Sequence, residues 1–330
     1  MALRLDGEDR WFSLPEGAVT VRVPTDARRV ALDPWGLSNQ DRGGDSWPPR
    51  WKLTLSGWLD RINLSSGYAD VGGWAGLRRT DSPQWLVSGS VWTGRQDLLG
   101  SNLAVTRLLG PQTTEIRRTH AISAWLSPAW LNSRFYDTGP VPLAIGAGLG
   151  WSWDTRVEAV FPLQGHRTSL GVDGGIAAGG ESWTAARGSA VGLWAPNTRL
   201  TFAGRVTGGV AEGRVQQRLL SLGGGDQLRS VAPEDAFGSR RVTVAGEARA
   251  VVLRNLGLNL GLGWLDDLQL SAGAEAGRVD GVSAVGVTGG IGLAGDVLGL
   301  DREIFTVLVA VPLQGPTEVP QVYVQWGQAY

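Results

Sequence analysis

The residues best suited to chemistry in this sequence form a glycine run, Leu222–Val231, which reads LGGGDQLRSV. The backbone N–H groups of such a run can cradle a phosphate, but this needs a hydrophobic strand before the run and a helix after it. Pro233 and Gly238 would interrupt a following helix, and no lysine followed by serine or threonine closes the run. A nucleotide-binding loop is therefore disfavoured, and another role is needed for the glycines and for Arg229.

Other catalytic combinations are scarce. The chain has no cysteine and only two histidines, His120 and His166, without the spacing of a metal-binding pair. These facts disfavour thiolate chemistry, zinc sites and a Ser-His triad. A net charge of -1 disfavours nucleic acid as a partner, since a phosphate backbone is bound through a surplus of Lys and Arg. We therefore expect a protein that is not an enzyme, with no cofactor, no bound metal and no nucleic-acid partner.

The elements that must position these residues begin near residue 51, where apolar and polar side chains alternate with a period of two. In Arg199–Val210 and Arg241–Val252, one face is apolar and the other carries Arg, Thr and Glu. Segments of about ten residues with this alternation, separated by turn residues, are typical of membrane barrels. Further candidate strands are 51–62, 68–79, 84–94, 101–109, 115–127, 143–153, 156–163, 169–178, 268–277, 285–293, 305–313 and 322–330. The pattern predicts an all-β fold, a transmembrane antiparallel β-barrel of about 14 to 16 strands.

Glycine and tryptophan are unusually frequent. The chain has 49 glycines, roughly twice the average usage of about 7%, which suits a tilted, curved sheet and an interior that a loop approaches closely. Several tryptophans fall near predicted strand ends, where interfacial aromatic girdles would lie. They are Trp74, Trp85, Trp125, Trp151, Trp153, Trp183, Trp194 and Trp326. A soluble β-sandwich binding protein is the alternative from another class, but its apolar faces would hold large branched residues rather than many Ala and Gly.

The end of the chain sets the orientation. Val322, Val324, Trp326 and the terminal Tyr330 lie on one face of a final strand. A terminal strand ending at an aromatic resembles the C-terminal signal by which bacterial outer-membrane barrels are recognised for assembly. This predicts a bacterial outer-membrane location, with membrane lipids, including lipopolysaccharide, and the barrel assembly machinery as partners. A periplasmic Tyr330 makes the turns at 195–198 and 295–301 periplasmic and places residues 214–240 on the extracellular side.

This arrangement resembles the bacterial surface antigen barrel, the C-terminal domain of outer-membrane assembly factors and two-partner secretion transporters. In that family the corresponding loop carries a glycine pair and an Arg-Gly-aromatic signature. Gly223 and Gly224 match the pair, with Gly225 extending the run, and Arg229 matches the arginine. Ser230-Val231 stands where the family has Gly-aromatic.

The family's second motif, (Phe or Gly)-x-Asp-x-Gly, lies on the inner wall. Here Gly273-Ala274-Glu275-Ala276-Gly277 matches it with Glu in place of Asp, and Glu247 matches another acid common in the family. The resemblance implies that the loop folds inward and that Arg229 pairs with Glu275, or as second choice with Glu247, pinning the loop as a lumen plug. A solvated arginine is the alternative, since many surface charges contribute nothing measurable. The implied function is protein translocation or assembly, or a pore or membrane anchor, with a translocated polypeptide as a further partner.

Residues 1–50 are predicted to form a short β-rich extension and linker before a barrel over 51–330. Val19–Val23 and Arg29–Leu32 are β-like, and SNQDRGGDSWPPR reads as a linker. Fifty residues cannot hold the periplasmic transport-associated modules that precede the barrel in the family.

The run RRVALDPWGLSNQDR resembles the last strand of bacterial gluzincin aminopeptidases, although the chain has no HExxH motif. The alternative function is thus a membrane-anchor barrel of an extramembrane peptidase-like enzyme. The first residues lack the basic segment and apolar core of a signal peptide, so we expect an exported form to begin upstream of Met1. No apolar run is long enough for a transmembrane helix.

Overall fold

The structure is a computed structural model. It describes residues 2–5, 8–11, 30–32, 46–47, 51–65, 67–79, 84–94, 96–109, 119–132, 143–156, 164–224, 227–232, 235–254, 256–259, 263–297 and 300–326.

Contacts divide the chain into two compact units, Met1–Leu53 with Leu77–Pro83, and Thr54–Gly76 with Gln84–Tyr330. The first unit contains an antiparallel four-stranded sheet in the order β2-β1-β3-β4. Its strands are β1 (Ala2–Leu5), β2 (Glu8–Trp11), β3 (Val30–Leu32) and β4 (Ser46–Trp47). β3 falls on the predicted run at 29–32, whereas the run at 19–23 lies outside the described residues. The domain boundary at residue 50 stays a prediction.

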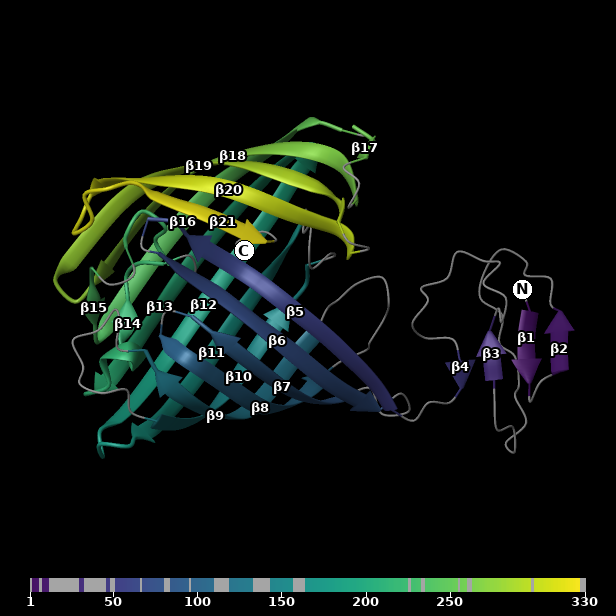
Figure 1. Cartoon of the computed structure of the whole chain (residues 1–330), viewed down its shortest axis with the longest axis horizontal. Coiled ribbons are helices and arrows are strands. Elements are labelled where there is room, and N and C mark those ends of the chain that lie inside the picture. The colour runs from purple at the N-terminus through teal and green to yellow at the C-terminus, as the bar shows by residue number, and fades with distance from the viewer. Residues whose placement is uncertain are drawn as a thin grey trace. The chain divides into compact units, whose positions relative to one another are not determined.

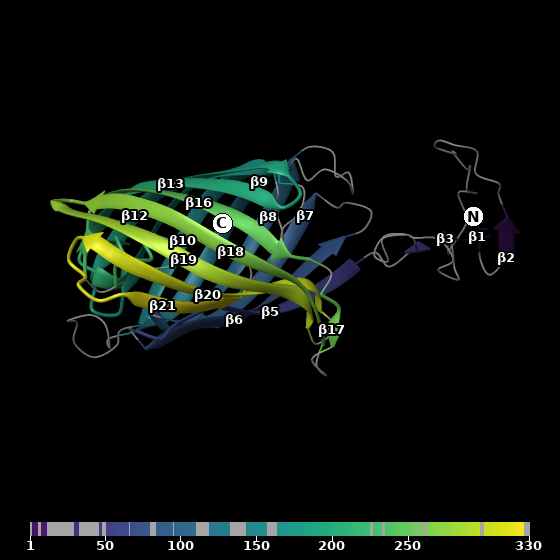
Figure 2. The ribbon, with the colours of Figure 1, turned by 90° about the horizontal axis from the view of Figure 1, so that it is seen from above.

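Fourteen strands of the described chain form one closed antiparallel sheet, and they run obliquely side by side in Figures 1 and 2. They are β5 (Trp51–Asn63), β6 (Tyr68–Arg79), β7 (Trp85–Thr93), β8 (Asp97–Leu109), β9 (Thr119–Leu131), β10 (Leu143–Asp154), β11 (Gly165–Ala177), β12 (Ser182–Asn197), β13 (Leu200–Gly213), β16 (Arg240–Leu253), β18 (Gly263–Val279), β19 (Val282–Val297), β20 (Leu300–Gln314) and β21 (Gln321–Trp326).

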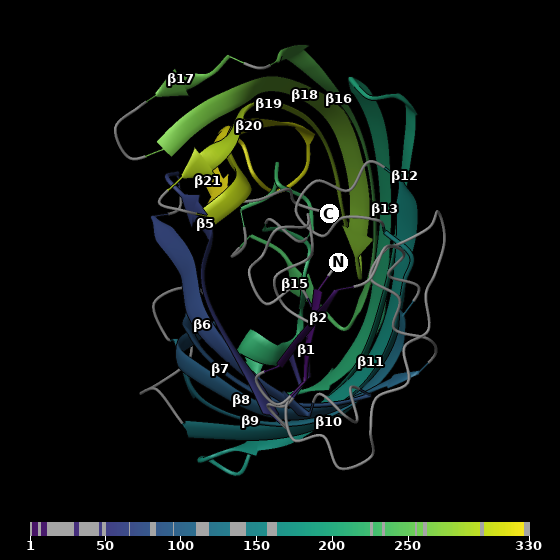
Figure 3. The same cartoon turned by 90° about the vertical axis from the view of Figure 1, so that its right-hand side faces the viewer.

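The sheet closes because its two ends pair. The strand order runs from β16 through β13 to β5, continues through β21 to β18, and returns to β16. The first and last strands of the ring, β5 and β21, pair with Tyr323 opposite Asn63. A two-residue strand, β17 (Leu258–Asn259), adds to β18. Figure 3 looks into this ring. The predicted all-β barrel is confirmed, with 14 strands among the described residues, and the soluble β-sandwich is wrong because one closed ring replaces two separate sheets.

The two faces of the barrel wall reverse the pattern of a water-soluble sheet. On β16, Val242 and Val244 are 54% and 51% exposed, whereas Glu247 and Arg249 are 8% and 3% exposed. β13 repeats the pattern with exposed Val206 and buried Arg205. We call the exposed apolar side the outer face and the buried, polar side the inner face. An apolar exterior around a polar interior is the arrangement that a lipid environment favours.

Within the described ranges, no helix is both long and apolar enough to cross a bilayer.

Several strand glycines make room for tryptophan rings on the inner face. A Cβ added at Gly150 would lie 3.0 Å from Cζ3 of Trp125, and one at Gly146 would lie 2.9 Å from Cζ2 of Trp183. Trp125 and Trp183 therefore contradict the expected girdle, since their rings lie over inner-face glycines. Trp194, which is exposed on the outer face and stacks on Phe202, fits the girdle.

Two strand predictions need correction. β12 was not among the predicted strands, although it is 16 residues long. A strand was also predicted at 156–163. Its first residue, Arg156, is not in a strand, and residues 157–163 lie outside the described ranges.

Candidate functional site

The segment that links β13 to β16 carries the predicted loop. We call residues 214–239 the loop segment, of which 225, 226, 233 and 234 lie outside the described residues. It contains a short 3-10 helix, η1 (Gln216–Arg218), and a small hairpin of β14 (Leu220–Ser221) and β15 (Phe237–Gly238). In Figure 3, β15 lies within the ring of strands. Apolar side chains of the segment form a buried cluster with the end of β18 and the start of β19. The cluster comprises Leu222, Leu228, Val231, Ala236, Val279 and Ala284.

The glycine run makes a tight turn in this segment. Gly224 has a φ of 107°, a conformation that side chains rarely adopt. A Cβ at Gly223 would collide with the carbonyl oxygens of Val231 and Ala232. The turn is closed by hydrogen bonds, among them that from the Leu228 N–H to the Leu222 carbonyl at 3.1 Å. Gly223 and Gly224 thus allow the backbone to make this turn. Gly225 lies outside the described residues.

Arg229 contacts the acid on the strand that follows the segment. Its Nη1 lies 2.8 Å from Oε2 of Glu247, and the side chains are 2% and 5% exposed. Glu247 Oε1 also accepts a hydrogen bond from Nε of Arg249, on the same strand. The carboxylate therefore lies between two buried guanidinium groups, which matters because a buried charge is costly without a partner.

Glu275, the first-choice partner of Arg229, contacts Ser230 instead. Its Oε1 accepts hydrogen bonds from the Ser230 backbone N–H at 2.6 Å and the Ser230 hydroxyl at 2.7 Å. Glu275 lies directly opposite Gly286 in the pairing of β18 with β19, and Ser230 occupies the space that a Cβ at Gly286 would need. The two candidate acids thus hold neighbouring residues, with Glu247 on Arg229 and Glu275 on Ser230.

The wall-motif glycines flank this contact. A Cβ at Gly273 would lie 2.6 Å from the Gly246 carbonyl oxygen. One at Gly277 would lie 2.9 Å from Cγ2 of Thr243 on β16 and 3.1 Å from Cδ1 of Leu222 in the loop segment. Both glycines therefore leave room for the neighbouring strand, and Gly277 also leaves room for the loop segment.

Two further anchors come from the end of the chain, and sequence reasoning missed both. The Tyr323 hydroxyl donates to the Arg229 carbonyl oxygen at 2.9 Å, and the Ala232 N–H donates to Oγ1 of Thr317 at 2.8 Å. Tyr323 lies on β21 between Val322 and Val324, which the sequence places on the apolar face. Because side chains alternate along a strand, this position was a signal that Tyr323 points inward. Thr317 lies in the turn between β20 and β21, where the sequence gives no comparable signal.

The start of the loop segment is held by other strands. Arg218 donates through Nη2 to Oδ1 of Asp97 on β8 at 2.7 Å. Arg187 of β12 donates to the Arg218 carbonyl at 3.0 Å, and Gln217 donates to the Asn132 carbonyl just beyond β9 at 3.2 Å. The segment is therefore attached to both β8 and β21, strands with three others between them in the ring order.

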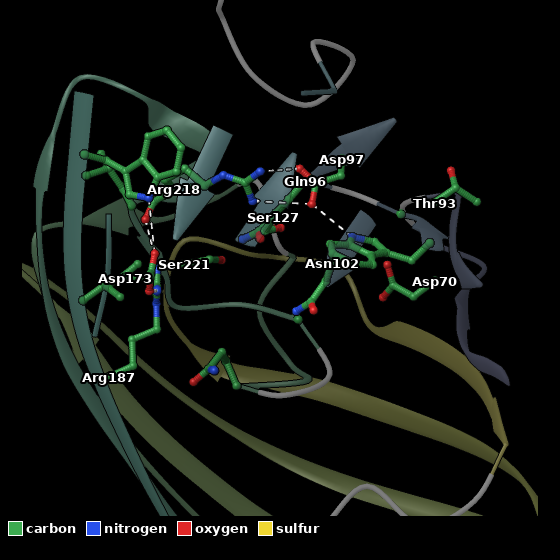
Figure 4. Close-up of a pocket in the computed structure, with 18 of the residues that line it drawn as sticks. Asp70, Thr93, Gln96, Asp97, Asn102, Ser127, Asp173, Arg187, Arg218 and Ser221 are labelled. Atoms are coloured by element: carbon green, nitrogen blue, oxygen red, sulfur yellow. Dashed lines mark hydrogen bonds and ion pairs between the residues drawn. The ribbon is translucent and has the colours of Figure 1, made fainter. Parts of the chain in front are cut away.

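A polar cavity of about 600 Å³ lies between the start of the segment and the wall formed by β6–β12. Carboxylates of Asp70, Asp97 and Asp173 and guanidinium groups of Arg187 and Arg218 border it, and Figure 4 shows these residues around the cavity. Within the described part of the chain, no group of three His, Asp or Glu residues is placed to hold a metal ion. The mixed charges suit water and small hydrated solutes.

The predicted assembly-signal residues are only partly described. β21 ends at Trp326, whose backbone pairs with Phe305 of β20, and Tyr330 lies outside the described residues.

Fold and site together define a closed antiparallel barrel with an apolar exterior, a charged interior and a chain segment fastened to its inner face. Among solved structures, the chain is similar to the crystal structure of BamA from Haemophilus ducreyi lacking POTRA domains 1–3. The two share 12% sequence identity over 85% of this chain and 70% of that chain, with a TM-score of 0.47. No model of a protein family and no curated protein matches the sequence.

Proposed function

We propose that the chain is a bacterial outer-membrane β-barrel that acts in the membrane without catalysis. The observation that carries this proposal is the exposed apolar outer face, including Val206, Val242 and Val244, around an inner face that buries Arg and Glu. In lipid, a closed ring satisfies every backbone hydrogen bond and has no open edge. Lipids of the outer membrane and the barrel assembly machinery are the partners that such a protein requires.

Heat-dependent migration on a gel tests the membrane barrel. A folded barrel in detergent is expected to migrate at a different apparent mass before and after boiling. A protein that stays in solution without detergent and migrates identically in both cases would contradict the proposal.

We further propose that the loop segment is a plug that limits passage through the barrel, and that translocation or assembly of polypeptides requires its displacement. Supporting this, the segment is fastened at one end to Asp97 and at the other to Glu247, Glu275 and Tyr323. The resemblance to the surface antigen barrel adds the expectation of a polypeptide substrate.

Planar bilayer recordings test the plug. Replacing residues 216–236 with a short Gly-Ser linker, which leaves both flanking strands intact, is expected to raise single-channel conductance severalfold. The matched control replaces the turn residue Gly179, between β11 and β12, with Ser, whose Cβ would meet no atom within 4 Å, and is expected to leave conductance unchanged. Equal conductance of the linker variant and the wild type would contradict the plug while leaving the membrane barrel intact.

An anchoring role is the second candidate. The observation in its favour is the four-stranded sheet of β1–β4, which shares no strand with the barrel sheet. Expression of 51–330 alone, which keeps all of β5, tests the anchoring role. An anchor would still insert and fold, whereas an enzyme carried by the removed residues would lose its attachment to the membrane fraction.

A further inference from the structure

The outer face of β9–β13 carries a groove that the plug does not involve. A row of residues paired in register crosses these strands and reaches β16. It consists of Ala124, Leu149, Val172, Ala186, Val210 and Arg240. Beside this row lie Ala147 and Thr184, which have small side chains, and Gly174, which has none. Their small size deepens a hollow of about 1150 Å³.

The groove runs from the rim of the barrel toward the middle of its wall. Arg240 is the first residue of β16, at the end of the barrel that carries the loop segment, whereas Ala124 lies in the middle of β9. Membrane strands tilt by about 35–45°, so a row perpendicular to the strands crosses the membrane obliquely. A lipid with its headgroup at the rim and its acyl chain toward the midplane would follow the same path.

The rim end of the groove is cationic. A second hollow of about 520 Å³ shares Val210, Ser239 and Arg240 with the groove and adds Arg278. Asp280 also borders it, but its carboxylate accepts hydrogen bonds from the Ser239 and Arg240 backbone N–H groups at 2.8 and 2.9 Å. Arg240 and Arg278 are exposed, and guanidinium groups bind phosphate with strong, charge-assisted hydrogen bonds.

We propose that this surface binds one phosphorylated, acylated lipid, with its phosphate at Arg240 and Arg278 and an acyl chain along the groove. Two acids line the groove. Glu212 lies at the same rim, and Asp173, farther down, is held in an ion pair with Arg187, which offsets its charge. This proposal rests on the proposed function, because the lipid must belong to the leaflet at the loop-segment end of the barrel.

Native mass spectrometry of the full chain in detergent tests the site with hexa-acylated, bis-phosphorylated lipid A as the probe. Ala186→Phe fills the groove, with Ala147→Leu as a second variant should the first not fold. Its control is Val206→Phe, on the outer face of β13 but outside the groove. The double variant Arg240→Gln/Arg278→Gln removes the phosphate contacts, and its control is Arg214→Gln, an exposed arginine at the same end of the barrel.

Each groove variant and the double variant are expected to weaken lipid A binding about tenfold, equivalent to about 1.4 kcal/mol, while both controls stay within about twofold of the wild type. Dephosphorylated lipid A is expected to bind the wild type as weakly as lipid A binds the double variant. Inorganic phosphate is expected not to compete, because it lacks the chain.

Equal binding by Ala186→Phe, Ala147→Leu and Val206→Phe, or displacement of the lipid by inorganic phosphate, would overturn the site. Every variant is first checked by heat-dependent gel migration. A wild type that shifts on heating but binds no lipid A overturns the site alone, whereas a wild type without a shift overturns the membrane barrel and the site together.

Discussion

Arg229 of the loop segment and Glu247 of β16 form an ion pair in which both side chains are almost fully buried. Glu247 also accepts from Arg249, so one carboxylate offsets two guanidinium groups. The pair fastens the proposed plug to the barrel wall, because Arg229 belongs to the loop segment and Glu247 to the wall.

Glu247→Gln is expected to destabilise the folded barrel by about 3–5 kcal/mol, because it leaves two buried cations without their carboxylate. The measurement is the temperature at which the unheated gel form disappears. Glu212→Gln, an exposed acid on the neighbouring strand β13, is the control and should change stability by less than about 0.5 kcal/mol. Equal midpoints for the two variants would show that the pair contributes nothing.

Gly286→Ala is expected to loosen the loop segment, because the new Cβ needs the space that Ser230 occupies. Losing the contacts of Ser230 with Glu275 would cost about 1–3 kcal/mol. Adding Ser230→Gly should partly restore stability by removing the colliding side chain. Gly289→Ala is the control, since the nearest atom to its added Cβ is the Ser271 carbonyl oxygen at 3.9 Å. A double variant no more stable than Gly286→Ala would rule out this contact as the cause.

Asp97→Asn is expected to free the start of the loop segment, because Arg218 would lose its carboxylate partner. Limited trypsin digestion reports this directly, and cleavage after Arg218 should become roughly tenfold faster. Glu181→Gln, in the exposed turn between β11 and β12, should leave the rate unchanged. Cleavage that is equally fast in both variants would indicate that Asp97 does not hold the segment.

Asp280, in the turn between β18 and β19, should make the tip of β16 sensitive to acid. The Ser239 backbone N–H is the main cause that lowers the pKa of Asp280, followed by the Arg240 N–H and the Ser239 hydroxyl. A lowered pKa means that the ionised form stabilises the tip at all pH values above the ordinary aspartate range, and that this contribution is lost as the pH falls through the lowered pKa.

Hydrogen exchange at Ser239 and Arg240, corrected for the intrinsic pH dependence, measures this effect. Protection should be constant at neutral pH and fall in acid below the ordinary range of aspartate. Asp280→Asn should show weaker protection with no such acid step, and an unchanged step in that variant would assign it to another group.

The barrel could be predicted because its signal is local. β13 and β16 alternate large apolar with charged side chains. The sequence of each strand alone therefore indicates which residues lie on its outer face and which on its inner face. β12 could not be recognised in the same way. Its outer face carries Ala186, Gly188 and Gly192, whereas its inner face carries Val191 and Leu193, so its alternation is weak or reversed.

For the site, the sequence predicts which types of residue take part, but not which acid contacts Arg229. Glu247 and Glu275 lie on paired strands, with Glu247 opposite Gly273 and Ala245 opposite Glu275. Two acids so close together offer Arg229 nearly equivalent positions. The choice depends on where the loop places Ser230 against Gly286, and on the Tyr323 hydroxyl, which is 94 residues away from Arg229. Such long-range packing leaves no mark in local sequence.

The loop segment is covalently joined at both ends to strands that pair with each other, β13 and β16. A displaced plug therefore cannot diffuse away, and its return is an intramolecular event whose rate does not depend on protein concentration. Opening would be reversible within a single molecule, and the open lifetime would be set by how quickly about 26 tethered residues find their contacts again.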